Sequence, residues 1–497
     1  MMKAEHLFPV HRNNWRRHGA KAEKDQSYDA QTGYLYSSFI IHHSSLSFMA
    51  KLWKKKVDLD AEMEKFTVGN DHVLDMDLVE ADALGSIAHA QMLAKIGILT
   101  DDEFRRLRAG LAEVIDLRNR GEFRIELAQE DVHTAIEEYL TAKLGDLGKK
   151  IHTGRSRNDQ VLLDTRIYTR DRLLEVQRET VHLADTLSAF AQKHHDVPMP
   201  GRTHTQRAMP SSVGLWAGAF AESLTDDLAL LQTAYDLNNQ CPLGSAASYG
   251  VPLALDRQLV ADLLGFAKVQ NNVLYANNSR GKIEAIVLFA LTEITHDLAK
   301  LAGDLILFSI PEFGYFTLPE KYFAGSSIMP QKRNPCQLEL TRAKSAAVEA
   351  ALFRVLHITR ALPSGYNRDF QETKEPLMQG LNTTLACLRV IRLVFENLTV
   401  NVDTLARSFT PELFAADEAI ELARKGVPFR DAYREVGMNI DKLAGRDPRQ
   451  NILAKTHQGA PGNLGLDRLR QHLAEQAKRL NNVEKQVQQA KQALLEA

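Results

Sequence analysis

Apolar residues recur at helical spacing through most of the chain from about residue 80 onward. Between residues 132 and 144 they form one stripe: Val132, Ala135, Ile136, Tyr139, Leu140 and Leu144. Steps of three and four residues predict an amphipathic helix. The alternation typical of strands is scarce, and hairpin dipeptides between apolar runs are lacking. The pattern therefore predicts an all-α protein.

Several helical stretches are unusually long and rich in Ala, Leu and Glu, namely 160–195, 211–238, 281–309 and 336–360. They exceed the ordinary helix of about 11–12 residues, and helices of this length bury their apolar stripes against one another. We therefore expect a central bundle of long helices. Glycine and proline cluster at 242–252, 310–319 and 325–335, which predicts loops there.

The C-terminal tail from Leu466 carries apolar residues at alternating steps of three and four: Leu469, Leu473, Leu480, Val483, Val487, Ala490 and Leu494. Only Gln476 interrupts this register. The pattern predicts a terminal helix packed on the rest of the protein. A true coiled coil is the alternative, and it requires a partner helix.

Composition excludes several classes of protein. The 497 residues are 44% hydrophobic and 25% charged, which is ordinary for a globular protein, and the net charge of −2 gives no general attraction for nucleic acid. The three cysteines, Cys241, Cys336 and Cys387, provide neither a disulfide framework nor a zinc spacing. No run approaches the roughly 18 apolar residues of a membrane helix, and no secretory signal is evident. We expect a cytoplasmic protein.

The segment 325–335 combines flexibility with chemistry. It opens with Gly-Ser-Ser, and Pro330 and Pro335 stiffen its second half. It carries a hydroxyl at Ser326, a cation at Lys332 and an amide at Asn334. We expect Asn334 and Pro335 to begin the next helix as its N-cap and first turn. A helix N-terminus beside Lys332 suits a carboxylate, and Gly-Ser-Ser suits a mobile lid. Composition alone equally describes a capped surface loop.

Three other polar segments have two interpretations each. The segment 152–160 is either a carboxylate clamp, through Arg155 and Arg157, or a network that caps a helix. The segment 201–210 contains His204, and a lone histidine is most often structural. The segment 362–375 is either the edge of a pocket or a solvated turn.

In this order, the four segments resemble the signatures of the fumarase/aspartase superfamily and of its argininosuccinate lyase branch. The segment 325–335 is characteristic of the superfamily. The segment 152–160, together with Tyr366, Gln371 and Lys374, is characteristic of the branch. Supporting similarity occurs at 82–89, 130–133 and 424–430. The resemblance extends from about residue 51 to the end of the chain.

The resemblance implies a three-domain fold and a homotetramer whose active sites each combine segments of three subunits. The expected parts are a loosely ordered extension or upstream start at 1–48, an N-terminal helical domain at 49–155, the bundle at 156–406 that forms the tetramer core, and a C-terminal helical domain at 407–497. The implied partners are a small-molecule substrate and other copies of the chain, with no nucleic acid or membrane. No metal or organic cofactor is required.

The resemblance also implies roles for individual residues. Ser326 is the lid hydroxyl, His204 is hydrogen-bonded to Glu339, and Lys332 stabilises the extra charge that a carboxylate gains when the neighbouring carbon loses a proton. Either Ser326 or His204 takes that proton. Residues implied in substrate binding are Arg157, Asn158, Ser156, Thr203, Asn334, Tyr366, Gln371, Lys374 and His133.

The implied activity is reversible β-elimination of argininosuccinate to arginine and fumarate. Among the departures from the family pattern, a serine expected shortly before Asp75 is missing, and the stretch 271–281 lacks an expected acidic residue. These departures favour, as an alternative, a sister lyase that acts on another N-substituted aspartate. A non-catalytic helical oligomer is the second alternative, and the intact catalytic set argues against it.

Overall fold

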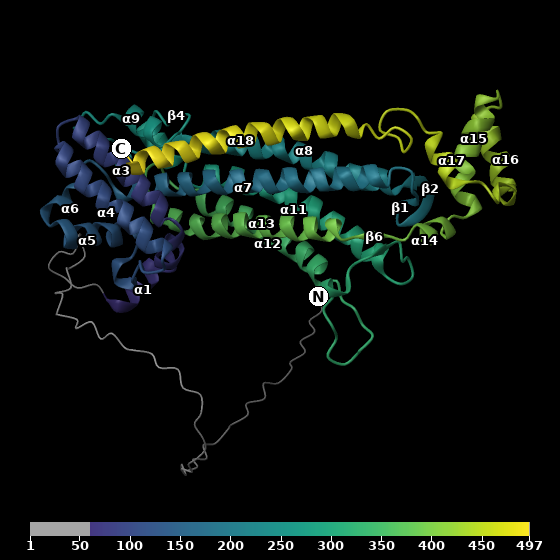
Figure 1. The fold of residues 1–497 in the computed structure, drawn as a ribbon, viewed down its shortest axis with the longest axis horizontal. Coiled ribbons are helices and arrows are strands. Elements are labelled where there is room, and N and C mark those ends of the chain that lie inside the picture. The colour runs from purple at the N-terminus through teal and green to yellow at the C-terminus, as the bar shows by residue number, and fades with distance from the viewer. Residues whose placement is uncertain (1–59, 497) are drawn as a thin grey trace, which may run out of the picture. The chain divides into compact units, whose positions relative to one another are not determined.

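The computed structural model describes residues 60–496, and helices make up most of that part of the chain (Figure 1). The prediction of an all-α protein is confirmed. The expected extension at 1–48 and the expected start of ordered sequence at Met49 lie outside the described residues.

Five long helices form the central bundle: α7 (Arg157–Lys193), α8 (Val213–Asn238), α11 (Lys282–Ser309), α12 (Cys336–Thr359) and α13 (Lys374–Glu396). The helix α7 packs against α8 and α13, and α11 packs against α8, α12 and α13 (Figure 1). The first four helices occupy the four stretches predicted from the sequence. Their facing apolar stripes belong to one continuous hydrophobic core.

The N-terminal region consists of shorter elements: α1 (Ala61–Val68), α2 (Asp71–Leu74), η1 (Asp75–Asp77), α3 (Val79–Lys95), α4 (Asp101–Asn119), η2 (Leu127–Gln129), α5 (Val132–Leu144) and α6 (Asp146–Lys150). In α5 the predicted stripe faces inward, with Val132, Ile136 and Leu140 buried. The helix α3 packs on α4 and α7, so this region continues the core of the bundle.

Short elements connect the long helices: β1 (Pro198–Thr203), β2 (Gln206–Ser212), β3 (Gln240–Cys241), α9 (Arg257–Leu263), β4 (Lys268–Val269), α10 (Val273–Asn278), β5 (Phe316–Thr317), η3 (Glu320–Tyr322), η4 (Arg368–Thr373) and β6 (Thr399–Val400). The strands β1 and β2 form an antiparallel hairpin. This hairpin lacks the usual turn dipeptides, because its two turn residues are His204 and Thr205. A search for such dipeptides therefore could not predict it.

The predicted start of α12 is also wrong. The helix begins at Cys336, its N-cap position is Pro335, and no side chain caps it. Asn334 instead forms a backbone bridge with Ala324, in which each N–H donates to the other residue's carbonyl oxygen at 3.0 Å. This bridge closes the base of the 325–335 loop, and it fixes the Asn334 backbone two residues before the first residue of the helix.

The C-terminal region comprises α14 (Val402–Arg407), η5 (Pro411–Phe414), α15 (Ala415–Arg424), α16 (Phe429–Met438), η6 (Ile440–Leu443), α17 (Pro448–Leu453) and α18 (Leu466–Glu496). A small separate core around Leu413, Phe414 and Val436 holds η5, α15, α16 and η6. The helix α18 returns along α7, with Leu473, Leu480 and others of its predicted stripe buried. The packed terminal helix is confirmed, while the three domain boundaries remain a prediction.

Within 60–496, no helix combines the length and the apolar character needed to cross a membrane.

Candidate active site

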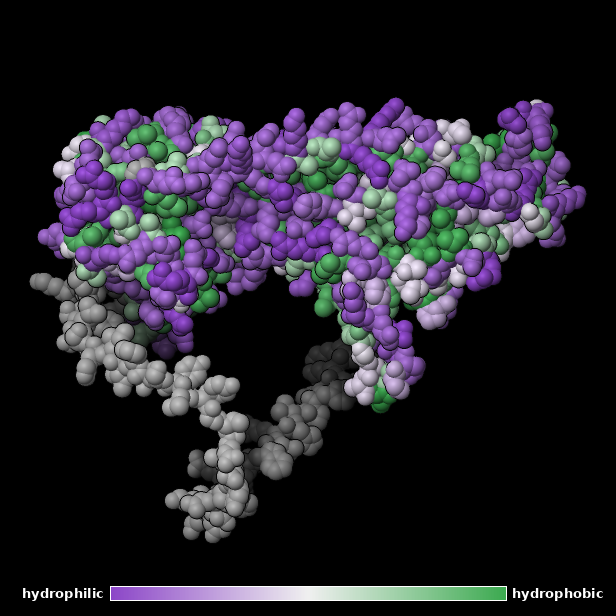
Figure 2. All heavy atoms as spheres, in the orientation of Figure 1, coloured by the Kyte–Doolittle hydropathy of each residue, from purple (hydrophilic) through white to green (hydrophobic). Residues whose placement is uncertain are grey.

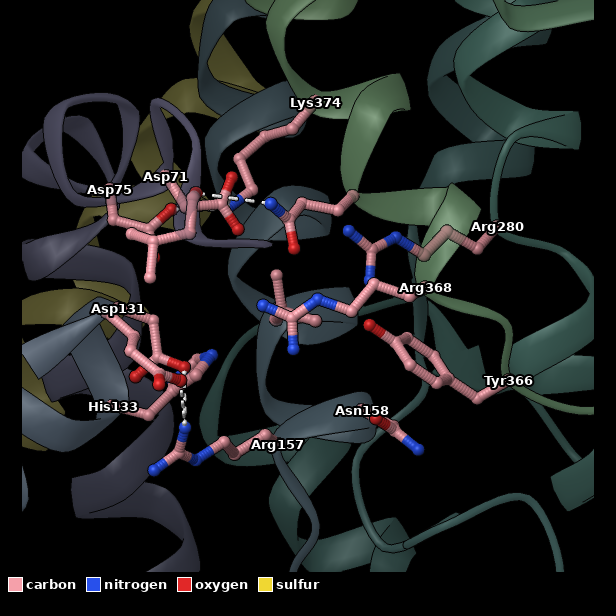
Figure 3. Close-up of a pocket in the computed structure, with 14 residues that line it drawn as sticks. Asp71, Asp75, Asp131, His133, Arg157, Asn158, Arg280, Tyr366, Arg368 and Lys374 are labelled. Atoms are coloured by element: carbon pink, nitrogen blue, oxygen red, sulfur yellow. Dashed lines mark hydrogen bonds and ion pairs between the residues drawn. The ribbon is translucent and has the colours of Figure 1, made fainter. Parts of the chain in front are cut away.

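A polar pocket of about 150 Å³ lies where the N-terminal ends of α5 and α7 meet α2, η4 and the start of α13 (Figure 3). Most of its lining side chains are charged. The lining residues are Val68, Asp71, Asp75, Glu130, Asp131, His133, Arg157, Asn158, Val161, Arg280, Tyr366, Arg368, Gln371 and Lys374.

The start of α7 brings two of these side chains to the pocket. Ser156 is the N-cap: its Oγ accepts the Asn158 N–H at 3.2 Å, and the Asp159 carboxylate accepts the Ser156 N–H at 2.9 Å. The other Asp159 oxygen accepts the N–H groups of Gly244 and Ala246, which ties this end of the helix to a loop. The helix-capping interpretation of segment 152–160 is therefore confirmed. Arg157 and Asn158 line the pocket, whereas Arg155 does not and donates to Ser86, so the carboxylate clamp stays a prediction.

Arg157 is held in place by acidic residues that precede α5. Its Nη1 donates to Asp131 at 3.1 Å and lies 3.5 Å from Glu130. Burial raises the pKa of the Asp131 carboxyl, but the charges of His133 and Arg157 and a hydrogen bond from Thr134 outweigh burial, so the pKa is lowered. Asp131 is therefore ionised at neutral pH and fixes the guanidinium at the pocket wall.

Lys374 is buried between two carboxylates. Its Nζ lies 2.5 Å from Asp75 and 3.1 Å from Asp71, and only 2% of its side chain is exposed. Asp75 accepts the Val132 N–H with its second oxygen, so it also caps α5. The two carboxylates raise the pKa of the Lys374 ammonium although burial, the largest influence, lowers it. The group is thus a cation flanked by two acids.

The segment before α13 is anchored by backbone contacts. Gly365 adopts φ +96°, a conformation that favours glycine, and its N–H donates to Asn278 at 2.8 Å. Gln371 and Arg368 both donate to the Thr67 carbonyl oxygen at the end of α1, at 3.0 and 2.7 Å. These contacts establish segment 362–375 as a pocket edge and leave the Tyr366 ring beside the cavity (Figure 3).

The charges of the pocket are separated in space. Figure 3 shows Asp71, Asp75 and Asp131 along one side, with Arg280 and Arg368 on the opposite side. A ligand with both a cationic and an anionic group fits this arrangement, because each end meets the opposite charge. Lys374 and Arg157 already pair with the acids of the first side, so Arg280 and Arg368 are the cations left to meet an anionic group of a ligand.

Six predicted substrate-binding residues meet in this pocket: His133, Arg157, Asn158, Tyr366, Gln371 and Lys374. Ser156 does not line it. The sequence interpretation missed the roles of Asp71, Asp75, Glu130, Asp131, Arg280 and Arg368. For Asp71 and Asp75 a signal existed, since a four-residue step in a helical segment places both on one face. Arg280 gave no comparable signal.

His204 and Thr203 lie far from the pocket within one chain. His204 and Thr205 form the exposed two-residue turn of the β1–β2 hairpin, with φ of 52° and 61°. The hairpin follows the C-terminal end of α7 (Figure 1). The pocket is lined by residues at the N-terminal end of that helix. A helix of 37 residues is about 55 Å long.

Ser326, Lys332, Asn334 and Glu339 occupy a third place, at the N-terminal end of α12. The Ser326 Oγ accepts the Met329 N–H at 3.1 Å, and Lys332 and Glu339 are exposed. The other end of α12 adjoins Gly281, next to the pocket, and 24 residues of helix separate the ends by about 36 Å. Within 60–496 of a single chain, no hydrogen bond joins His204 to Glu339, so that pairing stays a prediction.

Comparison with known proteins agrees with this architecture. A family model described as "Lyase" matches residues 20–349. Among solved structures, EDDS lyase in complex with formate superposes with a TM-score of 0.75 at 24% identity, covering 88% of this chain and 95% of that one. The class II fumarase from Schistosoma mansoni gives a TM-score of 0.66 at 17% identity, covering 81% and 98%. Fold and family model together define a lyase of the fumarase/aspartase superfamily.

Two curated relatives narrow the family. The argininosuccinate lyase of Parabacteroides distasonis is 45% identical over 414 residues, which cover 83% of this chain and 92% of the relative. That of Sorangium cellulosum is 46% identical over 429 residues, covering 86% and 99%. The chain belongs to the argininosuccinate lyase family.

Proposed function

We propose that this enzyme catalyses the reversible elimination of L-arginine from argininosuccinate, with fumarate as the second product. The observation that carries the proposal is the polarised pocket, which gathers six family substrate-binding residues in one chain. Its relatives that are named argininosuccinate lyases support the choice of substrate. A substrate that is an amino acid at one end and a dicarboxylate at the other matches the separated charges of the site.

The reaction needs a base, an acid and a site for transient charge. A base removes a proton from the succinate carbon beside a carboxylate, and that carboxylate then holds two negative charges. We assign this charge to Lys332 and Asn334. Collapse of the intermediate forms the carbon–carbon double bond and breaks the carbon–nitrogen bond, and an acid gives a proton to the leaving guanidine nitrogen. Ser326 and His204 are assigned to the two proton transfers.

We further propose a homotetramer whose active sites are shared between subunits. The three groups of predicted site residues lie at opposite ends of long helices, and a rigid bundle cannot bend to bring them together. Antiparallel packing of a second copy would place the C-terminal end of its α7 beside the N-terminal end of α7 in the first copy. Large apolar side chains of α11 and α12 are also exposed: Phe289, Leu340, Phe353 and Leu356. By contrast, the face of the molecule over α7 and α18 in Figure 2 is largely hydrophilic.

We propose that the enzyme acts in the cytoplasm and that the bundle at 156–406 is the tetramer core between two smaller helical domains. All three cysteines are unpaired, with Cys241 and Cys387 buried, which suits a reducing compartment. The elimination requires no metal or organic cofactor, because cationic side chains can supply the charge stabilisation.

The altered stretch around Asp71 raises a second candidate, a lyase for another N-substituted aspartate. Asp71 stands in the altered stretch where the family pattern has a serine nearby, and the structure puts its carboxylate in the pocket. The negative charge of Asp71 favours a substrate whose leaving amine carries a positive charge near this carboxylate. Argininosuccinate has such a group in its α-ammonium, so it remains the first candidate.

The test is fumarate release, followed by ultraviolet absorbance, from argininosuccinate, adenylosuccinate and aspartate. We expect release from argininosuccinate at the highest kcat/KM. As matched variants, Arg157→Lys should lower kcat/KM at least about 10-fold, because lysine does not reproduce the planar guanidinium at the pocket wall, while Arg424→Lys, in an exposed ion pair with Glu421, should leave it unchanged. Release from another succinyl amine alone would transfer the assignment to the sister lyase, and release from none of them would refute both.

A further inference from the structure

Behind the pocket wall, three buried side chains from three helices meet. They are Asp82 of α3, His133 of α5 and Asp164 of α7, and their nitrogen and carboxylate atoms all lie within 4.8 Å of one another. The His133 Nδ1 lies 2.5 Å from Asp82 and 3.6 Å from Asp164. At most 5% of any of these residues is exposed. The contact between His133 and Asp82 is therefore a direct hydrogen bond shielded from water.

The carboxyl groups of Asp82 and Asp164 differ in their protonation. For two adjacent buried carboxyls, repulsion adds to the cost of burial when both are ionised, which favours a proton on one of them. Burial, and then the charges of Asp82 and Asp75, raise the pKa of Asp164 well above its usual range. For Asp82, burial also raises the pKa, but the hydrogen bond and charge of His133 reverse the effect and lower it. Asp164 thus carries a proton and Asp82 is the carboxylate.

A second layer of contacts fixes Asp82. Ser86 donates to its other oxygen at 3.2 Å, and the buried Arg155 guanidinium donates to the Ser86 Oγ at 2.9 Å. With both oxygens engaged, Asp82 cannot turn away from the ring. The charged groups around the His133 ring, besides the two acids, are Asp75, Glu130, Asp131, His152, Arg155, Arg157 and Lys374.

The second nitrogen of His133 is available to a ligand. Its Nε2 is buried and has no hydrogen-bond partner within residues 60–496, while the residue lines the pocket with Arg157 and Asn158. In Figure 3 the His133 side chain extends from α5 toward the cavity. A buried N–H without a partner is costly unless a bound molecule accepts from it.

We propose that Asp82 is a positioning residue that, with a neutral Asp164 beside it, holds His133 as an imidazolium, so that its Nε2–H donates to an anionic oxygen of the bound substrate. Asp82 supplies the charge that keeps both ring nitrogens protonated, and the neutral Asp164 supports Asp82 without adding a second charge. The inference rests on the proposed function, because the anionic oxygen belongs to the substrate of the lyase reaction.

The decisive comparison is between Asp82→Asn and Asp164→Asn. Asparagine imitates a neutral acid, so Asp164→Asn should retain KM and kcat within about threefold, whereas Asp82→Asn should raise KM about 10- to 100-fold through loss of a charged hydrogen bond. The pH dependence of KM should also differ. The imidazolium holds substrate at low pH and loses it as pH rises through the pKa of His133, which Asp82 raises despite burial. In Asp82→Asn this loss of affinity should begin at lower pH, and in Asp164→Asn it should not move.

The double variant Asp82→Asn with His133→Asn serves as the control for an indirect role. Its KM should be no higher than that of His133→Asn alone, because Asp82 acts through the imidazole ring. If Asp82→Asn does not fold, His133→Asn is used in its place. Equal losses in Asp82→Asn and Asp164→Asn would overturn the division of charge. If KM of Asp82→Asn rises with pH over the same range as in the wild type, Asp82 contributes only to packing. Activity that falls with EDTA and returns with Zn²⁺ would make the trio a metal site instead. All comparisons use wild-type fumarate release as the reference, so a wild type inactive on argininosuccinate would count against the proposed function alone.

Discussion

Replacing Lys374 by methionine is expected to destabilise the protein strongly, because the ammonium is the shared partner of two acids. The Lys374 side chain is 2% exposed, that of Asp75 is 0% exposed and that of Asp71 is 17% exposed. Methionine fills most of the space but leaves Asp75 as a buried carboxylate without its cation. Removing one partner of a buried ion pair typically costs about 3–5 kcal/mol.

Two further variants separate the charge effect from lost packing. Adding Asp75→Asn to Lys374→Met should recover part of the loss, since the uncompensated charge disappears. Lys425→Met is the exposed control: Lys425 lies 3.7 Å from Glu421 with 61% of its side chain exposed, and such a pair contributes less than about 1 kcal/mol.

The assay is chemical denaturation at fixed protein concentration, because assembly contributes to the measured stability. The penalty of Lys374→Met should shrink as pH falls. Burial raises the pKa of Asp71 even with Lys374 present, and without that cation the Asp71 carboxyl takes up a proton more readily, which relieves part of the buried charge. A loss in Lys374→Met no larger than in Lys425→Met would refute the view that the trio is a coupled buried network.

Three further predictions concern catalysis, packing and pH. Ser326→Ala should lose about 10²–10⁴-fold in turnover. Co-refolding this variant with His204→Asn should restore a minority of the activity through mixed tetramers. A single variant that keeps over a tenth of wild-type turnover, or mixed tetramers that stay inactive, would contradict the shared site. Gly148→Ala should cost about 1–3 kcal/mol, because its Cβ would lie 2.5 Å from the backbone of α5, whereas Gly437→Ala, with no atom within 4 Å, should not destabilise; equal thermal midpoints would contradict this packing. Burial lowers the pKa of His152 from 6.5 to about 4, so protonation of the unfolded chain should reduce stability as pH falls through that interval, and His152→Gln should flatten the decline in thermal midpoint; an unchanged slope would mean that other groups cause it.

The amino-acid sequence determined most of the long helices of this protein and the polar segments to which its chemistry is assigned. The period of apolar residues marked α7, α8, α11, α12 and α18 because hydrophobic periodicity is a local property that each helix displays alone. The polar segments at 152–160, 201–210, 325–335 and 362–375 were visible for the same reason. Their resemblance to a known family supplied roles that composition left ambiguous.

Tertiary structure decided which of these segments meet. Lys374 pairs with Asp75 across 299 positions of sequence, and Arg280 reaches the pocket from a stretch that showed only a departure from pattern. Asp82, His133 and Asp164 form one cluster only because three helices cross at that point. Such pairings follow from how helices pack, and a buried charge acquires its partner, its pKa and its role from neighbours that no local pattern specifies.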